Sequence, residues 1–110
     1  MKRQEFPPHS ALAWTRSTTA VSVTFSGRQI IIGVTDTSAT RTVTLATVLL
    51  NDEPGSRLIV VKDEGGAAGS NTLTIATEGS ETIDGAATKT ITSNHGAIRL
   101  YNNGTNWFTW

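Results

Sequence analysis

The most constraining feature of this sequence is a run of short segments rich in Thr, Ile and Val, many with apolar and polar residues alternating, separated by turns that contain Gly. Residues 57–110 consist almost entirely of such segments and end on an aromatic stretch. Successive side chains of a strand face opposite sides, so a period of two indicates half-buried β-strands. No helical period of useful length is present. We therefore expect an all-β fold, built as a small antiparallel β-sandwich or a β-barrel-like domain.

The supply of core residues is small. A chain of 110 residues is close to the commonest size of a single domain. Leu, Ile, Val and Phe together account for 25 of the 110 residues, which is little for a well-filled core. We therefore expect part of the core to be shared between chains, in an intertwined homotrimer.

The charge balance and the residue types exclude several classes of protein. Nine acidic and nine basic residues give a net charge of zero, so the chain lacks the basic character of a general nucleic-acid binder. It has no cysteine, which excludes disulfides and thiolate metal sites. No export signal and no apolar run long enough to span a membrane is present. We expect no cofactor, no metal, no nucleic-acid partner and no membrane association.

The first 19 residues show neither helical nor alternating periodicity, and the alternating pattern begins at Ala20. We therefore divide the chain into an extended N-terminal docking arm, residues 1–19, and a single all-β domain, residues 20–110. The residues of the arm expected to dock on a partner are Phe6, Pro7, Pro8, Leu12 and Trp14. The alternative is a disordered terminus whose Trp14 merely packs against its own domain.

Several strands are predicted by their patterns. Alternation from Val21 to Phe25 and from Arg41 to Leu45 indicates strands with one buried face. The segments 29–34 and 58–61 are apolar on both faces, so they need cover on two sides. A short helical turn is plausible only between Ala46 and Asp52.

Turn residues predict two hairpins. Asp84-Gly85 and Asn103-Gly104 are dipeptides that favour tight turns, because both of their residues tolerate positive φ. The first should join the segment around Ile83 to residues 88–91, and the second should join residues 97–101 to residues 105–110. His95, which precedes Gly96, is expected to be a turn residue in the left-handed region.

Candidate catalytic groups are sparse. The acidic residues that could form a catalytic carboxylate pair all lie in or beside predicted turns, where solvation or loop capping is the commoner role. They are Asp63, Glu64, Glu78, Glu81 and Asp84. The two histidines, His9 and His95, have no metal-ligand spacing, and the glycine-rich stretch 65–69 lacks the lysine of a phosphate loop. We therefore predict no catalytic residue, and no enzymatic activity.

Three blocks of the second half resemble a known module. They are IVVKDEGGAAGSNTLTI, then GSETIDGAATKTIT, then GAIRLYNNGTNWF, and the resemblance covers residues 57–108. This succession resembles a β-rich module of the structural proteins of tailed bacteriophages, which include head-decoration proteins, tail fibres and spikes. The resemblance implies a virion component, usually trimeric, without enzymatic activity.

Because the chain is much shorter than most fibre relatives, we expect a capsid decoration (cement) protein located on the capsid surface, whose partner is the major capsid protein. The alternative is a short tail fibre or spike component that binds a host glycan, with Tyr101, Trp107 and Trp110 as stacking platforms. Both faces of the last strand carry aromatics, so we place it at the subunit interface. The predicted interface residues are Ile30, Ile31, Ile32, Trp107, Phe108 and Trp110.

Overall fold

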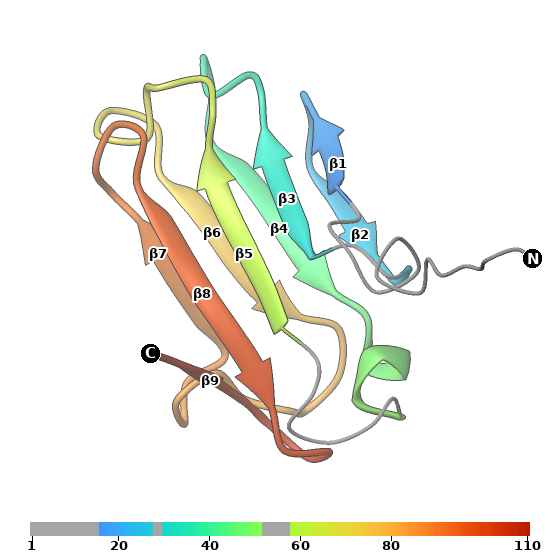
Figure 1. Ribbon diagram of the computed structural model, residues 1–110. Coiled ribbons are helices and arrows are strands. Elements are labelled where there is room, and N and C mark those ends of the chain that lie inside the picture. The colour runs from blue at the N-terminus through green and yellow to red at the C-terminus, as the bar shows by residue number, and fades with distance from the viewer. Residues whose placement is uncertain (1–15, 28–29, 52–57) are drawn as a thin grey trace, which may run out of the picture.

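The computed structural model describes residues 16–27, 30–51 and 58–110. Within these ranges the chain forms nine strands and one short 3-10 helix, η1 (Figure 1). Their bounds are β1 Arg16–Thr19, β2 Val23–Phe25, β3 Ile31–Val34, β4 Arg41–Leu45, η1 Thr47–Asn51, β5 Leu58–Asp63, β6 Leu73–Thr77, β7 Thr88–Ile91, β8 Ala97–Asn102 and β9 Trp107–Thr109. The expected all-β fold is confirmed, and η1 occupies the segment where a helical turn was predicted.

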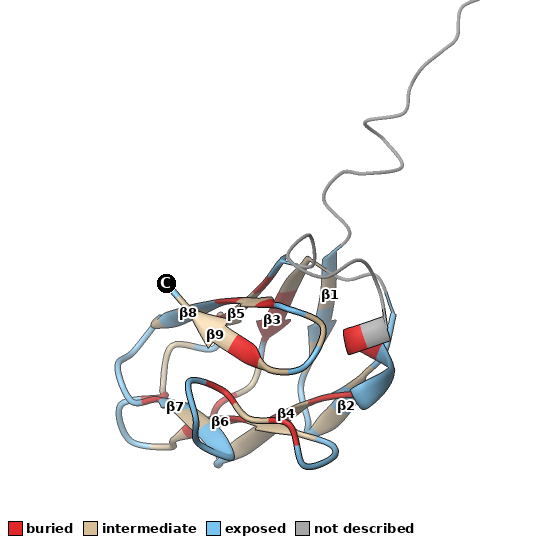
Figure 2. Ribbon diagram, turned by 90° about the horizontal axis from the view of Figure 1, so that it is seen from below, coloured by how far each residue is buried: buried red, intermediate tan, exposed pale blue. Residues whose placement is uncertain are grey.

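The strands form two sheets that lie one above the other (Figure 2). Sheet A has the strand order β1-β3-β5-β8-β9, and sheet B has the order β2-β4-β6-β7. From β1 to β6 the chain crosses to the other sheet after every strand. Each pair of successive strands therefore makes one coil, with one strand in each sheet.

The coils stack in parallel. In sheet A, Arg16 lies opposite Ile31, and Ile31 lies opposite Val60. In sheet B, β2, β4 and β6 are likewise parallel neighbours. The prediction of an antiparallel sheet is therefore wrong for the first six strands. Because the chain leaves each sheet and returns through the other, it re-enters each sheet in the same direction, which is the winding of a short two-sheet solenoid.

Among the described strands, antiparallel pairing occurs only where β7, β8 or β9 takes part. β7 pairs with β6, β8 pairs with β5, and β9 pairs with β8, all antiparallel. These three strands follow the last coil and cover its free edge in both sheets. At the other end, the edge strands are β1 and β2.

The core lies between the sheets and is built by the alternation of side chains along each strand. In β5 every second residue is buried, and the two buried residues of β4 and the two of β8 are likewise two positions apart. The fully buried large side chains come from both sheets, from η1 and from the β6–β7 connection. They are Ile32, Val34, Val43, Leu45, Leu49, Ile59, Val61, Leu73, Ile75, Ile83, Leu100 and Trp107.

The N-terminal boundary of the sheets differs from the expected one. Arg16–Thr19, placed in the arm by the sequence, form β1 and pair with β3. The strand expected from Val21 contains only β2, Val23–Phe25, and the Val21 side chain is 56 % exposed. The predicted docking residues Phe6, Pro7, Pro8, Leu12 and Trp14 lie outside the described residues.

The two predicted turns have different outcomes. Asp84 and Gly85 both take positive φ, 51° and 85°, and they close a tight turn between Ile83 and Ala86, as predicted. The expected hairpin partner is wrong, however, because β7 pairs with β6 instead. The hairpin of β8 and β9 is confirmed, with a longer turn in which only Gly104 has positive φ.

Trp107 should contribute far more to stability than Trp110. Trp107 is fully buried between the sheets, so Trp107→Ala should lower the free energy of unfolding by about 3–5 kcal/mol. Trp110 is 53 % exposed, so Trp110→Ala should cost less than about 1.5 kcal/mol. Urea unfolding followed by circular dichroism measures both variants. Equal losses would contradict this assignment of the core.

Candidate functional site

The buried carboxylate of Asp63 is the most highly coordinated polar group of the described chain. Asp63 ends β5 and is fully buried. Its Oδ1 accepts hydrogen bonds from the Thr37 hydroxyl at 2.9 Å and the Gly66 N–H at 2.8 Å. Its Oδ2 accepts from the N–H groups of Ala68 at 2.9 Å and His95 at 3.1 Å. One carboxylate therefore joins three connections: the loop after β3, the loop after β5 and the turn before β8.

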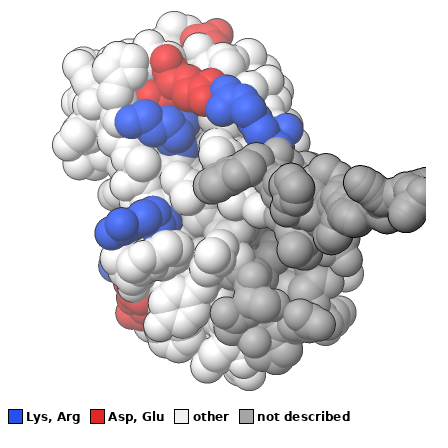
Figure 3. Space-filling model, in the orientation of Figure 1, with Lys and Arg blue, Asp and Glu red and all other residues white. Residues whose placement is uncertain are grey.

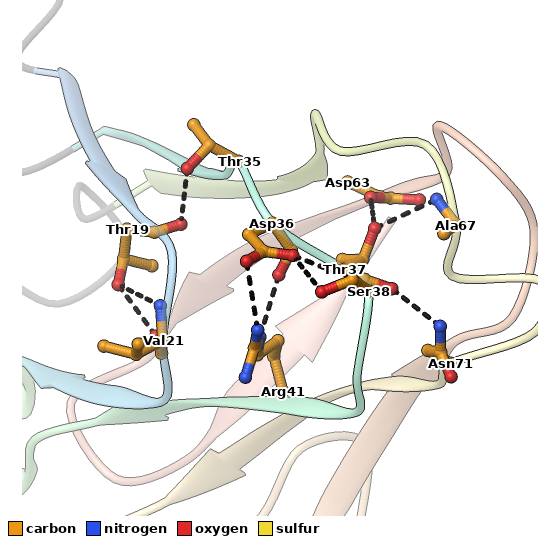
Figure 4. Close-up of polar contacts among 10 residues, drawn as sticks. All are labelled: Thr19, Val21, Thr35, Asp36, Thr37, Ser38, Arg41, Asp63, Ala67 and Asn71. Atoms are coloured by element: carbon orange, nitrogen blue, oxygen red, sulfur yellow. Dashed lines mark hydrogen bonds and ion pairs between the residues drawn. The ribbon is translucent and has the colours of Figure 1, made fainter.

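Thr37 extends this network. Its hydroxyl oxygen accepts the N–H of Ala67 at 2.9 Å, and its carbonyl accepts the side-chain amide of Asn71 at 2.8 Å (Figure 4). Asp36, next to it, binds Arg41 and Ser38. Thr37 is itself buried, so these contacts lie in the interior of the loop cluster.

Hydrogen bonding outweighs burial at Asp63. Burial by itself would raise the pKa of this carboxyl. The N–H groups of Ala68 and Gly66, the Thr37 hydroxyl and the N–H of His95 favour the charged form and hold the pKa below its usual range. A carboxylate that stays ionised and has four donors around it is suited to holding loops together, and it is poorly suited to accepting a proton from a substrate.

The other candidate acids also make contacts that hold the fold. Glu78 accepts the N–H of Thr47, the first residue of η1, and Glu81 accepts the hydroxyl of the same threonine. Glu78 therefore caps the start of η1, and Glu81 holds the side chain of the same threonine. Glu64 pairs with Arg16 across Gly33, where a Cβ would come within 2.4 Å of the Glu64 carboxyl carbon. Gly33 thus leaves room for an ion pair lying flat on sheet A.

His95 is a turn residue, as predicted. It has a φ of 59°, in the left-handed region, and its carbonyl accepts a hydrogen bond from Lys62. Among the described residues no group of three or more His, Asp or Glu side chains could hold a metal ion.

Residues 82–86 and 106–109 form one unit, which we term the cap. The N–H of Trp107 donates to the Thr82 carbonyl at 2.8 Å, and the Asp84 N–H donates to the Trp107 carbonyl at 3.0 Å. The Asp84 carboxylate accepts both the N–H and the hydroxyl of Thr109, and these bonds lower the pKa of Asp84. Ile83 and Trp107 are buried beneath these contacts. The cap therefore closes the space between the sheets at one end of the molecule (Figure 2).

Tyr101, Phe108 and Trp110, which are partly or largely exposed, lie at the outward side of sheet A. In β5 the buried residues are Ile59, Val61 and Asp63, so Leu58, Val60 and Lys62 face outward. Strand pairing continues this face in three rows. We term it the outer face of sheet A; its first two rows are Arg16, Ile31, Val60 and Arg99, and Leu58, Tyr101 and Phe108, and its further row, through Lys62, joins Thr18, Gly33, Lys62 and Ala97.

Aromatic contacts fix one end of this face. The Tyr101 ring stacks on Phe108 with a centroid distance of 5.6 Å, and it lies 5.9 Å from the Trp110 ring at a tilt of 59°. The Arg99 guanidinium lies 5.2 Å from the Trp110 ring centroid and donates to the Trp110 main-chain oxygen at 2.6 and 3.1 Å. Trp110 is therefore held in place although it is exposed.

The outward side of sheet B has a different composition. Its strands bury Val43, Leu45, Leu73 and Ile75, so the intervening residues face outward. We term these outward residues the threonine face; they are Thr24, Thr42, Thr44, Thr74, Ala76, Thr88 and Thr90. This face is small, polar and uncharged, as expected of a sheet surface in contact with water.

The predicted interface residues fall into two groups. Ile32 and Trp107 are fully buried inside the subunit, because the alternation of their strands turns them toward sheet B. Neither is available to a neighbouring chain, and Trp107 is likewise not available to stack on a glycan. Ile30, Ile31 and Phe108 are partly exposed, and Trp110 is the most exposed of the set. Leu58, Val60 and Arg99 were not among the predicted residues, because their place beside the aromatics depends on strand pairing.

A comparison with protein-family models finds no match for this chain, and a comparison with curated proteins finds none either. No helix among the described residues has both the length and the apolar character needed to cross a membrane.

Asp63→Asn should destabilise the protein and alter its response to acid. The amide replaces an acceptor by a donor that faces N–H groups, so the free energy of unfolding at neutral pH should fall by about 1.5–3 kcal/mol. The lowered pKa of Asp63 means that its contribution is present above its ordinary pKa of about 3.9 and is lost as pH falls through the folded value.

Urea unfolding at neutral pH and near pH 3 measures this effect. The wild-type protein should lose more stability on acidification than Asp63→Asn does. Asp36→Asn is the control; the side chain of Asp36 is 44 % exposed, whereas Asp63 is fully buried, so this variant should change both values less. An acid response unchanged in Asp63→Asn would contradict the role given to this carboxylate.

Proposed function

We propose that this chain is a non-enzymatic structural protein of a bacteriophage virion, and specifically a capsid decoration (cement) protein that acts as a homotrimer on the capsid surface. In this proposal the two sheets form a sandwich-like unit and the N-terminal arm contacts the major capsid protein. A protein that binds the assembled shell and not its dissociated subunits stabilises the shell by mass action. At a concentration one hundred times the Kd the effect is about 2.7 kcal/mol per site.

The cap is the observation that carries this proposal. The blocks TIDGA and YNNGTNW, which support the resemblance to phage virion proteins, are separated in sequence but contact each other directly through Thr82, Asp84 and Trp107. Their joint occurrence therefore has a physical reason, since the backbone groups of each block are hydrogen-bond partners of the other. The acidic side chains described above hold loops and turns, which supports a structural role over a catalytic one.

Deletion of residues 1–15 should abolish capsid binding and leave the sheets folded. The deletion ends before β1, because Arg16–Thr19 pair with β3. Binding is measured by co-sedimentation with emptied capsids of the phage that encodes the chain, and folding by circular dichroism. A matched control keeps the full length and replaces Phe6, Leu12 and Trp14 by Ser; it should also fail to bind. Normal binding of the truncated protein would refute the docking role of the arm.

The alternative is a tail fibre or spike component that binds a host glycan, and the exposed Trp110 beside Tyr101 favours it. Aromatic rings held on a sheet surface are suited to stacking on sugar rings. Trp110→Ala should then abolish binding to host surface polysaccharide in affinity electrophoresis, while Thr105→Ala, in the exposed β8–β9 turn, should not. Absence of binding by the wild-type protein would remove this alternative.

A further inference from the structure

We propose that Asn103, in the turn between β8 and β9, is a site of spontaneous deamidation, and that the buried side chain of Asn102 retards this reaction by holding the Gly104 N–H. The modification is independent of the proposed function, since its only co-reactant is water.

An Asn-Gly pair carries the two groups that react. The main-chain nitrogen of Gly104 attacks Cγ of Asn103, a C–N bond forms, and the side-chain nitrogen leaves as ammonia, which includes the proton that Gly104 gives up. Water then opens the resulting succinimide ring at one of its two carbonyl groups. The product is aspartate, or isoaspartate, in which the main chain runs through the former side chain. Glycine in the second position favours the reaction because it has no Cβ that crowds the approach.

Both reacting groups are accessible to water. Asn103 is exposed and Gly104 is partly exposed, with a φ of 92°. The lowest part of the face drawn in Figure 3, where β8 leads into β9, shows no charged side chain among the described residues. We therefore expect solvent hydroxide, and not a basic side chain, to take the Gly104 proton, so that the rate of deamidation rises with pH.

Three hydrogen bonds hold the reacting groups in the folded turn. The side-chain oxygen of Asn103 accepts the N–H of Thr105 at 3.0 Å and the N–H of Asn106 at 2.9 Å. The Gly104 N–H donates to Oδ1 of Asn102 at 3.0 Å. Deamidation has to break this last bond, because the Gly104 nitrogen must lose the same proton before it attacks. The folded turn therefore slows the reaction.

Asn102 is placed for this contact. It is fully buried and lies opposite Trp107 in the pairing of β8 with β9. Its Nδ2 has no hydrogen-bond partner among the described residues, and a buried polar group without a partner lowers stability. An apolar residue would suit this part of the core better, so the bond to Gly104 is what an asparagine adds at this position.

Conversion of Asn103 to isoaspartate should weaken the cap. Isoaspartate adds one methylene group to the main chain between β8 and β9 and displaces the oxygen that binds the N–H groups of Thr105 and Asn106. The side chain of Asn106 in turn accepts the N–H of Thr82 at 2.9 Å. A displaced turn therefore disturbs the contact between the two segments of the cap.

Incubation of the full chain at mildly alkaline pH tests the proposal. Peptide mapping by mass spectrometry measures the replacement of the side-chain NH2 of Asn103 by OH, and methylation by an isoaspartyl methyltransferase detects the isoaspartate. The wild-type protein unfolded in urea should be modified at Asn103 faster than the folded protein. Asn103→Ser should remove the signal at this position.

Asn102→Ala and Leu100→Ala form a matched pair of variants. Both replace a fully buried residue of β8, and only the first removes the acceptor of the Gly104 N–H. Deamidation at Asn103 should be about two- to tenfold faster in Asn102→Ala than in Leu100→Ala, which is the rate equivalent of one hydrogen bond. Amide hydrogen exchange at Gly104, followed by NMR, should rise by a similar factor, because exchange requires the same proton to leave.

A comparison within the wild-type protein needs no variant that folds. Folding should slow deamidation at Asn103 and hydrogen exchange at Gly104 together. A folded wild-type protein that is modified as fast as the unfolded one would overturn the proposal. It would also be overturned by equal rates in Asn102→Ala and Leu100→Ala, or by modification of another asparagine before Asn103.

Discussion

The burial of side chains between the two sheets is the interaction on which the rest of the structure depends. Each coil contributes one short strand to each sheet, and no strand of three to six residues could bury its apolar face alone. The inward residues of β3 and β5 meet those of β4 and β6, and together they form one core. Because the sheets share this core, the loops at both ends have to hold the sheets in register, and the Asp63 network and the cap meet this requirement.

The Asp63 network and the cap hold the two ends of the sheets together by different interactions. At one end Asp63 gathers backbone N–H groups from separate loops around an ionised carboxylate, so the closure is electrostatic and sensitive to pH. At the other end the cap buries Ile83 and Trp107 beneath main-chain hydrogen bonds, so the closure is mainly hydrophobic. The chain can therefore hold its two sheets together with few apolar residues. At one end the Asp63 carboxylate joins the loops, and at the other end the burial of Trp107 does so.

Local features of this fold could be predicted from the sequence, and the pairing of strands could not. The alternation around Val43, the positive φ of Asp84 and His95, and the hairpin of β8 and β9 follow from local residue chemistry. Parallel stacking depends on contacts between distant residues, and the coils have unequal lengths: 15 residues separate Arg16 from Ile31, and 29 separate Ile31 from Val60. Without a fixed period no repeat is visible. The outer face of sheet A was missed for the same reason, since only pairing brings Leu58 and Arg99 beside the aromatics.

The covering of the last coil by β7 and β8 has a consequence for synthesis. A chain that emerges from the ribosome completes β5 and β6 before the strands that pair with their free edges have been made. Until then both sheets present unpaired backbone groups to other nascent chains, and such edges are prone to pair with the wrong partner. The segment after β6 therefore pairs with the edges of β5 and β6 as well as completing the fold, and premature termination within it would release a chain in which both of these edges are unpaired.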